Sequence, residues 1–245
     1  MKVNCSIVLY HTPIAEVQTV VERLRKCSLV ANIWLIDNSE LMTERFEFLE
    51  CDYIFGHGNI GYGKGHNIAL DKSLATDADY HLVLNSDIEF EPSLIESLAE
   101  FMEQHKDVAH VMPKVLNPDG TDQHLAKRLP SPWDLMHRRL FGSNRCALNL
   151  ADDGVWDVPY LSGCFMFLRS ESLRQLKASE GFVFDPRFFL YPEDLDLTRR
   201  LNTRFRTVYY PALSIIHCHR KESYKSLRMT MVHAWNMMKY FWKWR

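Results

Sequence analysis

Short apolar runs alternate with helical periodicities along the first half of the chain. The apolar runs predict strands at Cys5–Tyr10, Ile33–Asp37, Tyr53–Phe55, His81–Leu84 and Ala109–Met112. Apolar residues at every third or fourth position predict helices at Ile14–Lys26, Gly65–Leu74, Pro92–His105 and Glu193–Arg204. Alternation of this kind predicts an α/β protein with a largely parallel central sheet and helices on both faces.

The alternation is interrupted after Pro113. Residues 117–157 contain several turn-forming prolines and glycines and predict long loops with short helices. The segment Phe205–Ile216 then indicates the end of a helix, a strand and a connecting turn. A chain of 245 residues is long enough for one large α/β domain.

Composition narrows the functional class. A formal net charge of −2 argues against wholesale nucleic-acid binding, and we expect no nucleic-acid partner. The six cysteines are scattered without a CxxC pair, which predicts reduced thiols, a cytoplasmic location and no zinc ribbon. Met1–Asn4 leads directly into a strand, and no apolar run is long enough to cross a bilayer. We therefore expect that any membrane contact is peripheral, on the inner face of the plasma membrane.

Two acidic segments carry candidate chemistry. Glu193, Asp194 and Asp196 follow an aromatic run and open a predicted helix, where burial raises a carboxyl pKa and the helix dipole lowers it. Such a setting is typical of a general base. Upstream, an apolar strand ends in Asn85-Ser86-Asp87, at the edge of the sheet where ligands bind in open α/β folds. An Asp in that position suits Mg²⁺ or Mn²⁺ together with substrate phosphates.

A glycine-rich segment precedes both acidic segments in the chain. Gly61, Gly63 and Gly65 would let the backbone approach a diphosphate closely and tolerate positive φ. Their spacing matches neither the dinucleotide fingerprint nor a P-loop. The segment therefore indicates a nucleotide site only in combination with the acidic segments.

In combination, these motifs resemble the family 2 glycosyltransferases, inverting enzymes with the GT-A fold. The likeness is strongest to the rhamnosyltransferase-like branch of bacterial surface-polysaccharide biosynthesis. Five segments carry it in order: Ser6–Tyr10, Ile36–Ser39, Asn59–Asn67, Asn85–Asp87 in place of the DxD motif, and Glu193-Asp194. The resemblance implies a Rossmann-like GT-A catalytic domain at 1–219, with a nucleotide-binding half at 1–113 and an acceptor-binding half at 114–219. A basic amphipathic helix at 220–245 follows it.

The resemblance also implies roles for individual residues. The implied nucleotide-binding residues are Tyr10, His11, Asp37, Asn59, Gly61, Gly63, Gly65, Asn67, Asn85, Ser86 and Asp87, with Asn67 ordering the glycine-rich loop. Asp87 would bind the metal with His217, which follows Asp194 by 23 residues; His219, on the same side of an extended segment, is the rival. Asp194 with Glu193 would form the catalytic pair, with Asp196 as the alternative base. Asn85 departs from the usual motif and leaves one fewer charge on the metal.

The implied reaction is sugar transfer from a nucleotide diphosphate donor to a saccharide or a polyprenyl-diphosphate-linked acceptor. The favoured donor is dTDP-rhamnose, and the products are O-antigen, capsule or exopolysaccharide. A UDP-hexose-dependent transferase and a non-catalytic sugar-nucleotide-binding module remain alternatives. A sugar nucleotidyltransferase would need a basic, glycine-rich loop after the first strand, where this chain has His11-Thr12-Pro13.

Two further regions suggest where the acceptor binds. From Arg220 to Arg245 the chain has seven basic residues against one acid, with Trp and Met at helical spacing. This helix either lies on a membrane surface or packs on its own domain or on a partner subunit. A second basic stretch, with Lys127, Arg128, Arg138 and Arg139 around Trp133, is a candidate site for the acceptor or its phosphates. We expect Phe184–Pro186 and Tyr160–Phe165 to frame the acceptor pocket, with Ser162-Gly163 under the donor sugar.

Overall fold

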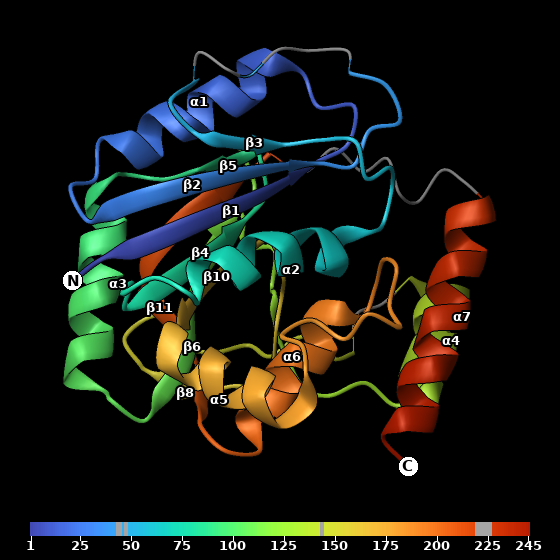
Figure 1. Cartoon of the computed structure of the whole chain (residues 1–245). Helices are drawn as coiled ribbons and strands as arrows, with labels where there is room; N and C mark the ends of the chain where they lie inside the picture. The colour runs from blue at the N-terminus through green and yellow to red at the C-terminus, as the bar shows by residue number, and fades with distance from the viewer. Residues whose placement is uncertain (43–45, 47–48, 143–144, 219–226) are drawn as a thin grey trace.

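The structure, a computed structural model, describes residues 1–42, 46, 49–142, 145–218 and 227–245. Within these residues a nine-stranded sheet runs through the middle of the molecule (Figure 1), and two further strands form a separate small sheet. The strands are β1 (Val3–Leu9), β2 (Val30–Asp37), β3 (Asp52–Ile54), β4 (Tyr80–Leu84), β5 (Ile88–Glu89), β6 (Val108–Leu116), β7 (Ala126–Lys127), β8 (Trp156–Asp157), β9 (Tyr160–Leu161), β10 (Phe165–Arg169) and β11 (Arg206–His217). The helices are α1 (Ile14–Arg25), α2 (Tyr62–Ser73), α3 (Ser93–Gln104), α4 (Pro132–Phe141), α5 (Ser170–Glu180), α6 (Glu193–Asn202) and α7 (Leu227–Lys243).

The strand order explains how distant parts of the chain meet. Strands β3, β2, β1 and β4 lie side by side and run parallel, as do β6 and β11. Strand β10 lies between β4 and β6 and runs antiparallel to both. The predicted α/β architecture is confirmed, and strands from the second half of the chain complete the sheet begun by the first.

Helices cover the sheet on both faces, so its inner strands are apolar on both sides. The core on one face includes Val17 and Leu24 of α1 and Met102 of α3. The core on the other face includes Leu70 of α2 and Leu173 of α5, with residues of α6. All five residues of β4 are buried, as expected for a strand covered on both faces.

Helix α2 begins earlier than the sequence predicts. It starts at Tyr62, so Gly63 and Gly65 lie inside the helix and only Gly61 of the three has a positive φ. A Cβ on Gly65 would lie 2.8 Å from Val8 Cγ2, and one on Gly63 would lie 3.0 Å from the Phe184 Cβ. These glycines therefore allow α2 to pack closely, which offsets their low helix propensity.

The C-terminal helix packs on its own domain through one face. Met237 and Tyr240 of α7 are buried beside Phe188, and Asn236 Nδ2 donates to the Leu190 carbonyl at 2.8 Å. Residues 220–226 of the predicted helix lie outside the described residues. No described helix has the length and apolarity needed to cross a membrane.

Candidate active site

A cavity of about 410 Å³ opens beyond the carboxyl ends of β1 and β4. Eight residues predicted from the sequence line it: Tyr10, His11, Asn85, Ser86, Asp87, Glu193, Asp194 and His217. The two acidic segments, far apart in the sequence, thus face one cavity. Ser162 and Gly163 line it as well, whereas Phe184–Pro186 do not.

Asp87 and His217 line the cavity next to each other. Strand β5 pairs with the end of β11, and this pairing brings the turn after β4 next to His217. His217 Nε2 lies 3.3 Å from Asp87 Oδ1, and the amide nitrogen of Asn85 lies 3.5 Å from the same ring nitrogen. His219, the rival ligand, lies outside the described residues.

The donor set formed by Asp87 and His217 fits a hard divalent cation. Burial disfavours the charged imidazole, but the hydrogen bond to Asp87 and the neighbouring Cys164 raise the pKa of His217 to about 10. A cation bound here would replace the proton on this imidazole. The described residues contain no cluster of three or more His, Cys, Asp or Glu side chains that could hold a metal. A protein site with so few ligands suits Mg²⁺, which keeps waters and substrate phosphates in its coordination shell.

The Asp194 carboxylate lines the same cavity. Its Oδ2 accepts the Gly163 N–H at 2.9 Å, and its Oδ1 accepts the Leu195 N–H at 2.8 Å. The Tyr160 hydroxyl lies 3.4 Å from Oδ2. A Cβ on Gly163 would lie 3.0 Å from the Asp194 Cβ, so the absence of a side chain there leaves room for the carboxylate.

Glu193 and Asp194 are adjacent carboxyl groups whose negative charges repel each other. Burial, together with the adjacent Asp194, raises the pKa of Glu193 to about 8, and Glu193 Oε2 has no hydrogen-bond partner among the described residues. Burial also raises the pKa of Asp194, but the N–H groups of Gly163 and Leu195 and the charge of Lys127 oppose the shift. Burial and mutual repulsion therefore disfavour the state in which both carboxyl groups are ionised.

Asp196, the alternative base, faces away from the cavity. It is fully buried and accepts hydrogen bonds from Arg200 Nε at 2.8 Å and Trp244 Nε1 at 2.9 Å. Lys243 Nζ lies 2.7 Å from its Oδ1. Asp185, from the segment predicted to frame the acceptor pocket, is likewise buried and pairs with Lys243 at 2.8 Å. Both carboxylates hold α7 against the domain.

Six predicted nucleotide-binding residues do not line the cavity: Asp37, Asn59, Gly61, Gly63, Gly65 and Asn67. Asp37 is buried and accepts the Tyr53 hydroxyl at 2.6 Å. Asn59 Oδ1 accepts the Gly61 N–H at 3.2 Å. A Cβ on Gly61 would lie 2.0 Å from the Phe189 carbonyl oxygen, so this glycine is required by packing.

Asn67 orders a different segment from the one predicted. Its side chain exchanges two hydrogen bonds with the backbone of Phe184, at 2.8 and 2.9 Å, and makes none to the glycine-rich loop in the part of the chain described. The predicted role in the glycine-rich loop came from the family resemblance. The fold places α2 against the segment before α6, and the side chain reaches across that contact.

Sequence reasoning missed Tyr62, which lines the cavity and connects the Asn85 segment with the Gly163 segment. Its hydroxyl lies 3.0 Å from Asn85 Oδ1 and 2.8 Å from the Gly163 carbonyl oxygen. Tyr62 stands between two of the predicted glycines, so its place in the motif was the signal. Glu16, on α1, also lines the cavity and was not predicted.

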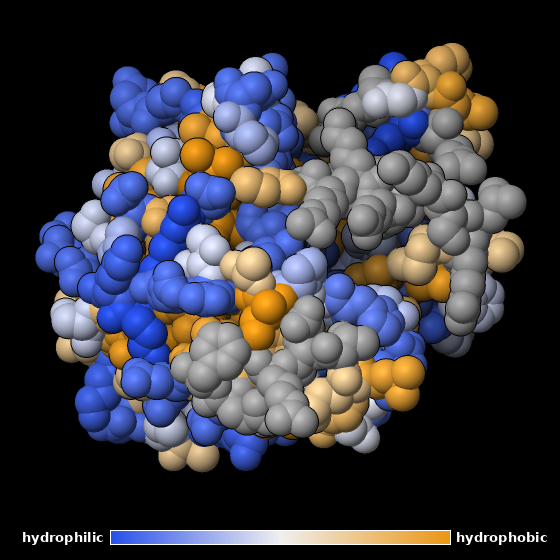
Figure 2. Space-filling model, turned by 90° about the horizontal axis from the view of Figure 1, so that it is seen from above, coloured by the Kyte–Doolittle hydropathy of each residue, from blue (hydrophilic) through white to orange (hydrophobic). Residues whose placement is uncertain are grey.

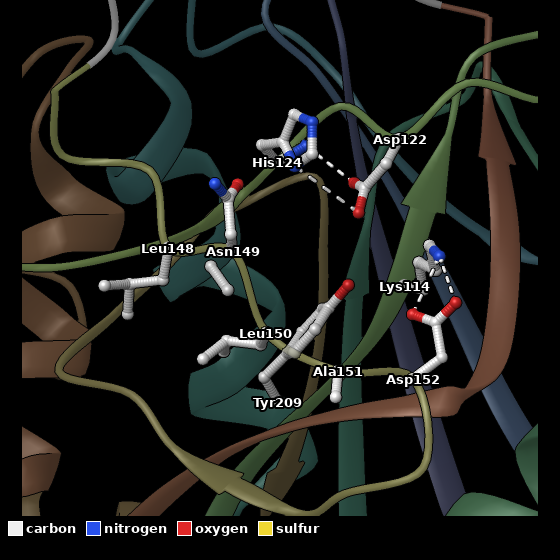
Figure 3. Close-up of a pocket in the computed structure, with 10 residues that line it drawn as sticks. Lys114, Asp122, His124, Leu148, Asn149, Leu150, Ala151, Asp152 and Tyr209 are labelled. Carbon is white, nitrogen blue, oxygen red and sulfur yellow. Dashed lines mark hydrogen bonds and ion pairs between the residues drawn. The ribbon is translucent and has the colours of Figure 1, made fainter.

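A second cavity of about 330 Å³ lies between β6, β11 and residues 148–152 (Figure 3). Its charged groups pair with one another: Lys114 Nζ lies 2.8 Å from Asp152, and His124 Nδ1 lies 3.6 Å from Asp122. The main cavity is lined by residues of both predicted acidic segments. We therefore take the main cavity as the candidate active site.

Comparison with known proteins agrees with this geometry. The sequence model of the family described as Glycosyl transferase family 2 matches residues 16–177. This chain belongs to glycosyltransferase family 2. The resemblance to this family, expected from the sequence motifs, is thereby confirmed.

Two named relatives of this family 2 glycosyltransferase are rhamnosyltransferases. The N-acetylglucosaminyl-diphospho-decaprenol L-rhamnosyltransferase of Mycobacterium tuberculosis is 28% identical over 65% of this chain and 56% of its own length. Rhamnosyltransferase WbbL of Escherichia coli K12 is 28% identical over 68% of this chain and 63% of its own length. The matched region thus spans less than two thirds of either relative.

Solved structures confirm the GT-A fold. S. aureus TarS superposes with a TM-score of 0.60 at 15% identity, covering 91% of this chain and 37% of TarS. The mannosyltransferase PcManGT of Pyrobaculum calidifontis, solved with GDP-Man and Mn²⁺, gives a TM-score of 0.60 at 13% identity, covering 91% of this chain and 58% of that protein. At such identities the likeness concerns the fold.

Proposed function

We propose that this family 2 glycosyltransferase moves a sugar from a nucleotide diphosphate to an acceptor hydroxyl in a single displacement that inverts the anomeric configuration. The observation that carries the proposal is that Asp87, His217 and Asp194 line one cavity. A single displacement needs charge neutralisation at the leaving diphosphate and a base on the opposite face of the sugar.

The donor would bind at the end of the cavity that follows β1 and β4. Asp87 and His217 would hold Mg²⁺ or Mn²⁺, which would neutralise the charge developing on the diphosphate. Tyr10, His11 and Ser86 line the same cavity and would contact the nucleotide. The Mn²⁺ and GDP-Man bound to PcManGT, which shares the fold, support this choice of ligands.

Asp194 would take the proton of the acceptor hydroxyl as the oxygen attacks the anomeric carbon. The Gly163 N–H, donating to Asp194 Oδ2, fixes the direction of the carboxylate. Glu193 would keep its proton near neutral pH and so leave the negative charge on Asp194. A base that is only partly screened from solvent and has a raised pKa suits proton abstraction near neutral pH.

The names of the relatives favour rhamnose from dTDP-rhamnose as the donor sugar and a polyprenyl-diphosphate-linked saccharide as the acceptor. A UDP-hexose donor is the alternative. The reaction would serve bacterial O-antigen, capsule or exopolysaccharide assembly on the cytoplasmic face of the plasma membrane. The six cysteines are free, which fits a reducing compartment.

Thermal unfolding with UDP, dTDP, GDP and CMP, each with and without Mn²⁺, tests the proposal. Because ligand binding to the folded state raises the melting temperature, we expect a shift with dTDP that grows with Mn²⁺. The shift should disappear in Asp87→Ala and persist in Asp152→Ala, a matched change in the second cavity. No shift with any nucleotide would sink the proposed donor site.

Turnover separates the enzyme from a non-catalytic binding module. The nucleotide sugar of the responding nucleotide should be hydrolysed slowly by the wild-type protein and far more slowly by Asp194→Asn. Binding without any hydrolysis or transfer would favour the binding module.

A further inference from the structure

Helices α4 and α7 expose large hydrophobic side chains at helical spacing. Trp133, Leu140 and Phe141 of α4 and Met231, Trp235 and Trp242 of α7 are all more than half exposed. We call the surface formed by these six side chains the α4–α7 face. Figure 2 shows hydrophobic atoms on the right side of the molecule, where both helices stand in Figure 1.

This exposure does not come from a poorly packed helix. The opposite side of α7 is fixed to the domain through Tyr240, Lys243 and Trp244. Leu135 of α4 packs against the same hydrophobic cluster as Met237 of α7, so the two helices are neighbours. Two adjacent helices thus bury one side each and leave an apolar stripe outside.

The charge around the face is of one sign. Residues 227–245 contain no acid, and the one acid of α4, Asp134, is buried and paired with Arg128. Arg138 and Arg245 are exposed on the same two segments. Tryptophans among cations suit the headgroup region of a bilayer with anionic lipids. A second copy of the chain would bring the same cations together across a twofold contact.

We propose that the α4–α7 face docks on an anionic lipid bilayer. His233 of α7 packs on the ring of Tyr191, which lines the candidate active site, with ring centroids 5.1 Å apart. Docking therefore places the cavity beside the membrane, where a lipid-linked acceptor would be presented. That purpose rests on the proposed function, whereas the docking itself does not.

Co-sedimentation of the full chain with vesicles tests the docking. We expect binding to vesicles of phosphatidylcholine with phosphatidylglycerol, little binding to phosphatidylcholine alone, and a loss of binding as salt rises. Trp235→Glu with Trp242→Glu should lower the vesicle partition coefficient by at least about tenfold. Leu41→Glu, an exposed hydrophobic residue elsewhere, should leave it unchanged.

Two outcomes would overturn the docking proposal. One is equal binding of the wild type and the double variant to anionic vesicles, or binding by neither. The other is a concentration-dependent dimer in light scattering that the double variant abolishes, which would assign the face to a second copy. The dTDP-induced melting shift, measured in the same proteins, reports the donor site separately.

A second inference concerns Gln123, which contacts His217 from the side opposite Asp87. Gln123 Nε2 donates to the carbonyl oxygens of His217 at 2.9 Å and Leu116 at 3.3 Å. Its Oε1 lies 3.2 Å from His217 Nδ1. Since the two carbonyls can only accept, they fix the amide orientation and leave Oε1 as an acceptor. Nδ1 must then carry a hydrogen, and Nε2 is the nitrogen directed at Asp87.

We infer that Gln123 is a positioning residue that presents His217 Nε2 to the proposed metal. Such partners of a metal-bound histidine fix its tautomer and ring orientation. The backbone of Gln123 is held independently, because its N–H donates to the Val115 carbonyl at 2.9 Å. This inference rests on the proposed metal site.

Binding of Mn²⁺ alone, followed by electron paramagnetic resonance of the free ion, tests the role of Gln123. Gln123→Leu removes both the acceptor and the donors and should weaken Mn²⁺ binding by roughly 10–100-fold. Gln123→Glu also loses the two donated bonds but keeps an acceptor toward Nδ1, so it should retain most of the affinity. Gln175→Leu, a surface glutamine bonded to Glu171, is the matched control.

Each outcome separates the inference from the metal site itself. Equal losses in Gln123→Leu and Gln123→Glu would show a merely structural role. Unchanged affinity in Gln123→Leu, with affinity lost in His217→Ala, would overturn the inference and leave the metal site standing. Failure of the wild type to bind Mn²⁺, with or without dTDP, would remove the metal site and the inference together.

Discussion

Asp194 and Asp196 lie two residues apart on α6, yet their surroundings have little in common. Asp194 faces the cavity and receives two backbone N–H groups, from Gly163 and Leu195. Asp196 is fully buried among Arg200, Lys243 and Trp244. Since residues two apart cannot share a helix face, one turn of α6 serves both the cavity and the core.

This difference shows how the surroundings of two aspartates on one helix can give one a chemical role and the other a structural role. Backbone donors orient Asp194 without neutralising its charge, which leaves it able to accept a proton. Two cations and an indole N–H surround Asp196 and hold its carboxylate in the core. We therefore expect substitution of the first carboxylate to change turnover and substitution of the second to change stability.

The largest expected effect is on turnover in Asp194→Asn. Loss of a general base typically costs about 10²–10⁴-fold in rate, so kcat should fall by that factor. Stability should hold or rise, because burial raises the pKa of this carboxyl and makes its charge unfavourable. Steady-state kinetics with the responding donor and the dTDP-induced melting shift measure the two effects. A loss of donor binding as large as the loss of turnover would contradict the proposed role.

Asp196→Asn should mainly affect the free energy of unfolding. Removing one partner of a buried ion pair commonly costs about 3–5 kcal/mol, and here it leaves Arg200 and Lys243 without their shared carboxylate. Urea denaturation compares this variant with Asp194→Asn. Normal stability with abolished turnover in Asp196→Asn would reverse the assignment of the two residues.

Gly163→Ala sharpens the comparison by moving Asp194 without removing it. The added Cβ would lie 3.0 Å from the Asp194 Cβ, so the carboxylate must shift. A displacement on the order of 1 Å can cost up to about 10²-fold in rate, and we expect a fall in kcat of roughly tenfold or more. Wild-type kcat in Gly163→Ala would show that Asp194 tolerates displacement.

The smallest expected effect is a change of pH dependence in Lys127→Met. Burial raises the pKa of Asp194, and the Lys127 charge lowers it. Removing the Lys127 charge raises the pKa of Asp194. As the pH falls, Asp194 is then protonated, and activity is lost, at a higher pH than in the wild type. The acid limb of the kcat profile should therefore move to higher pH, whereas Lys106→Met on the surface should leave it in place. An unmoved or oppositely moved limb would exclude Lys127 as an electrostatic partner.

The sequence predicted the elements with strong periodicity and the residues at strand ends. Helix α1 begins at the predicted Ile14, and the residues after β1 and β4 line the cavity as expected from parallel-sheet topology. Strand β10 was missed, because a five-residue apolar run between polar segments does not reveal its partners. Helix α5 was missed because little beyond Leu173 and Leu176 marks its apolar face.

The nucleotide-binding roles that the family resemblance implies for the glycines and Asn67 remain predictions. Their contacts in the structure depend on Phe184, Val8 and Phe189. The sequence does not show which of these distant residues will lie against α2. By contrast, Asp87 and Asp194 line the cavity because strand ends and helix starts are local features.

The central position of β10 has a consequence for synthesis of the chain on the ribosome. Strand β4 pairs with β1 on one side and with β10 on the other, so its second edge stays open until residue 169 has been made. An open edge of an apolar strand attracts other chains. A nascent or truncated chain ending near residue 113 would thus expose this edge of β4, and we expect residues 1–113 not to fold stably when expressed alone.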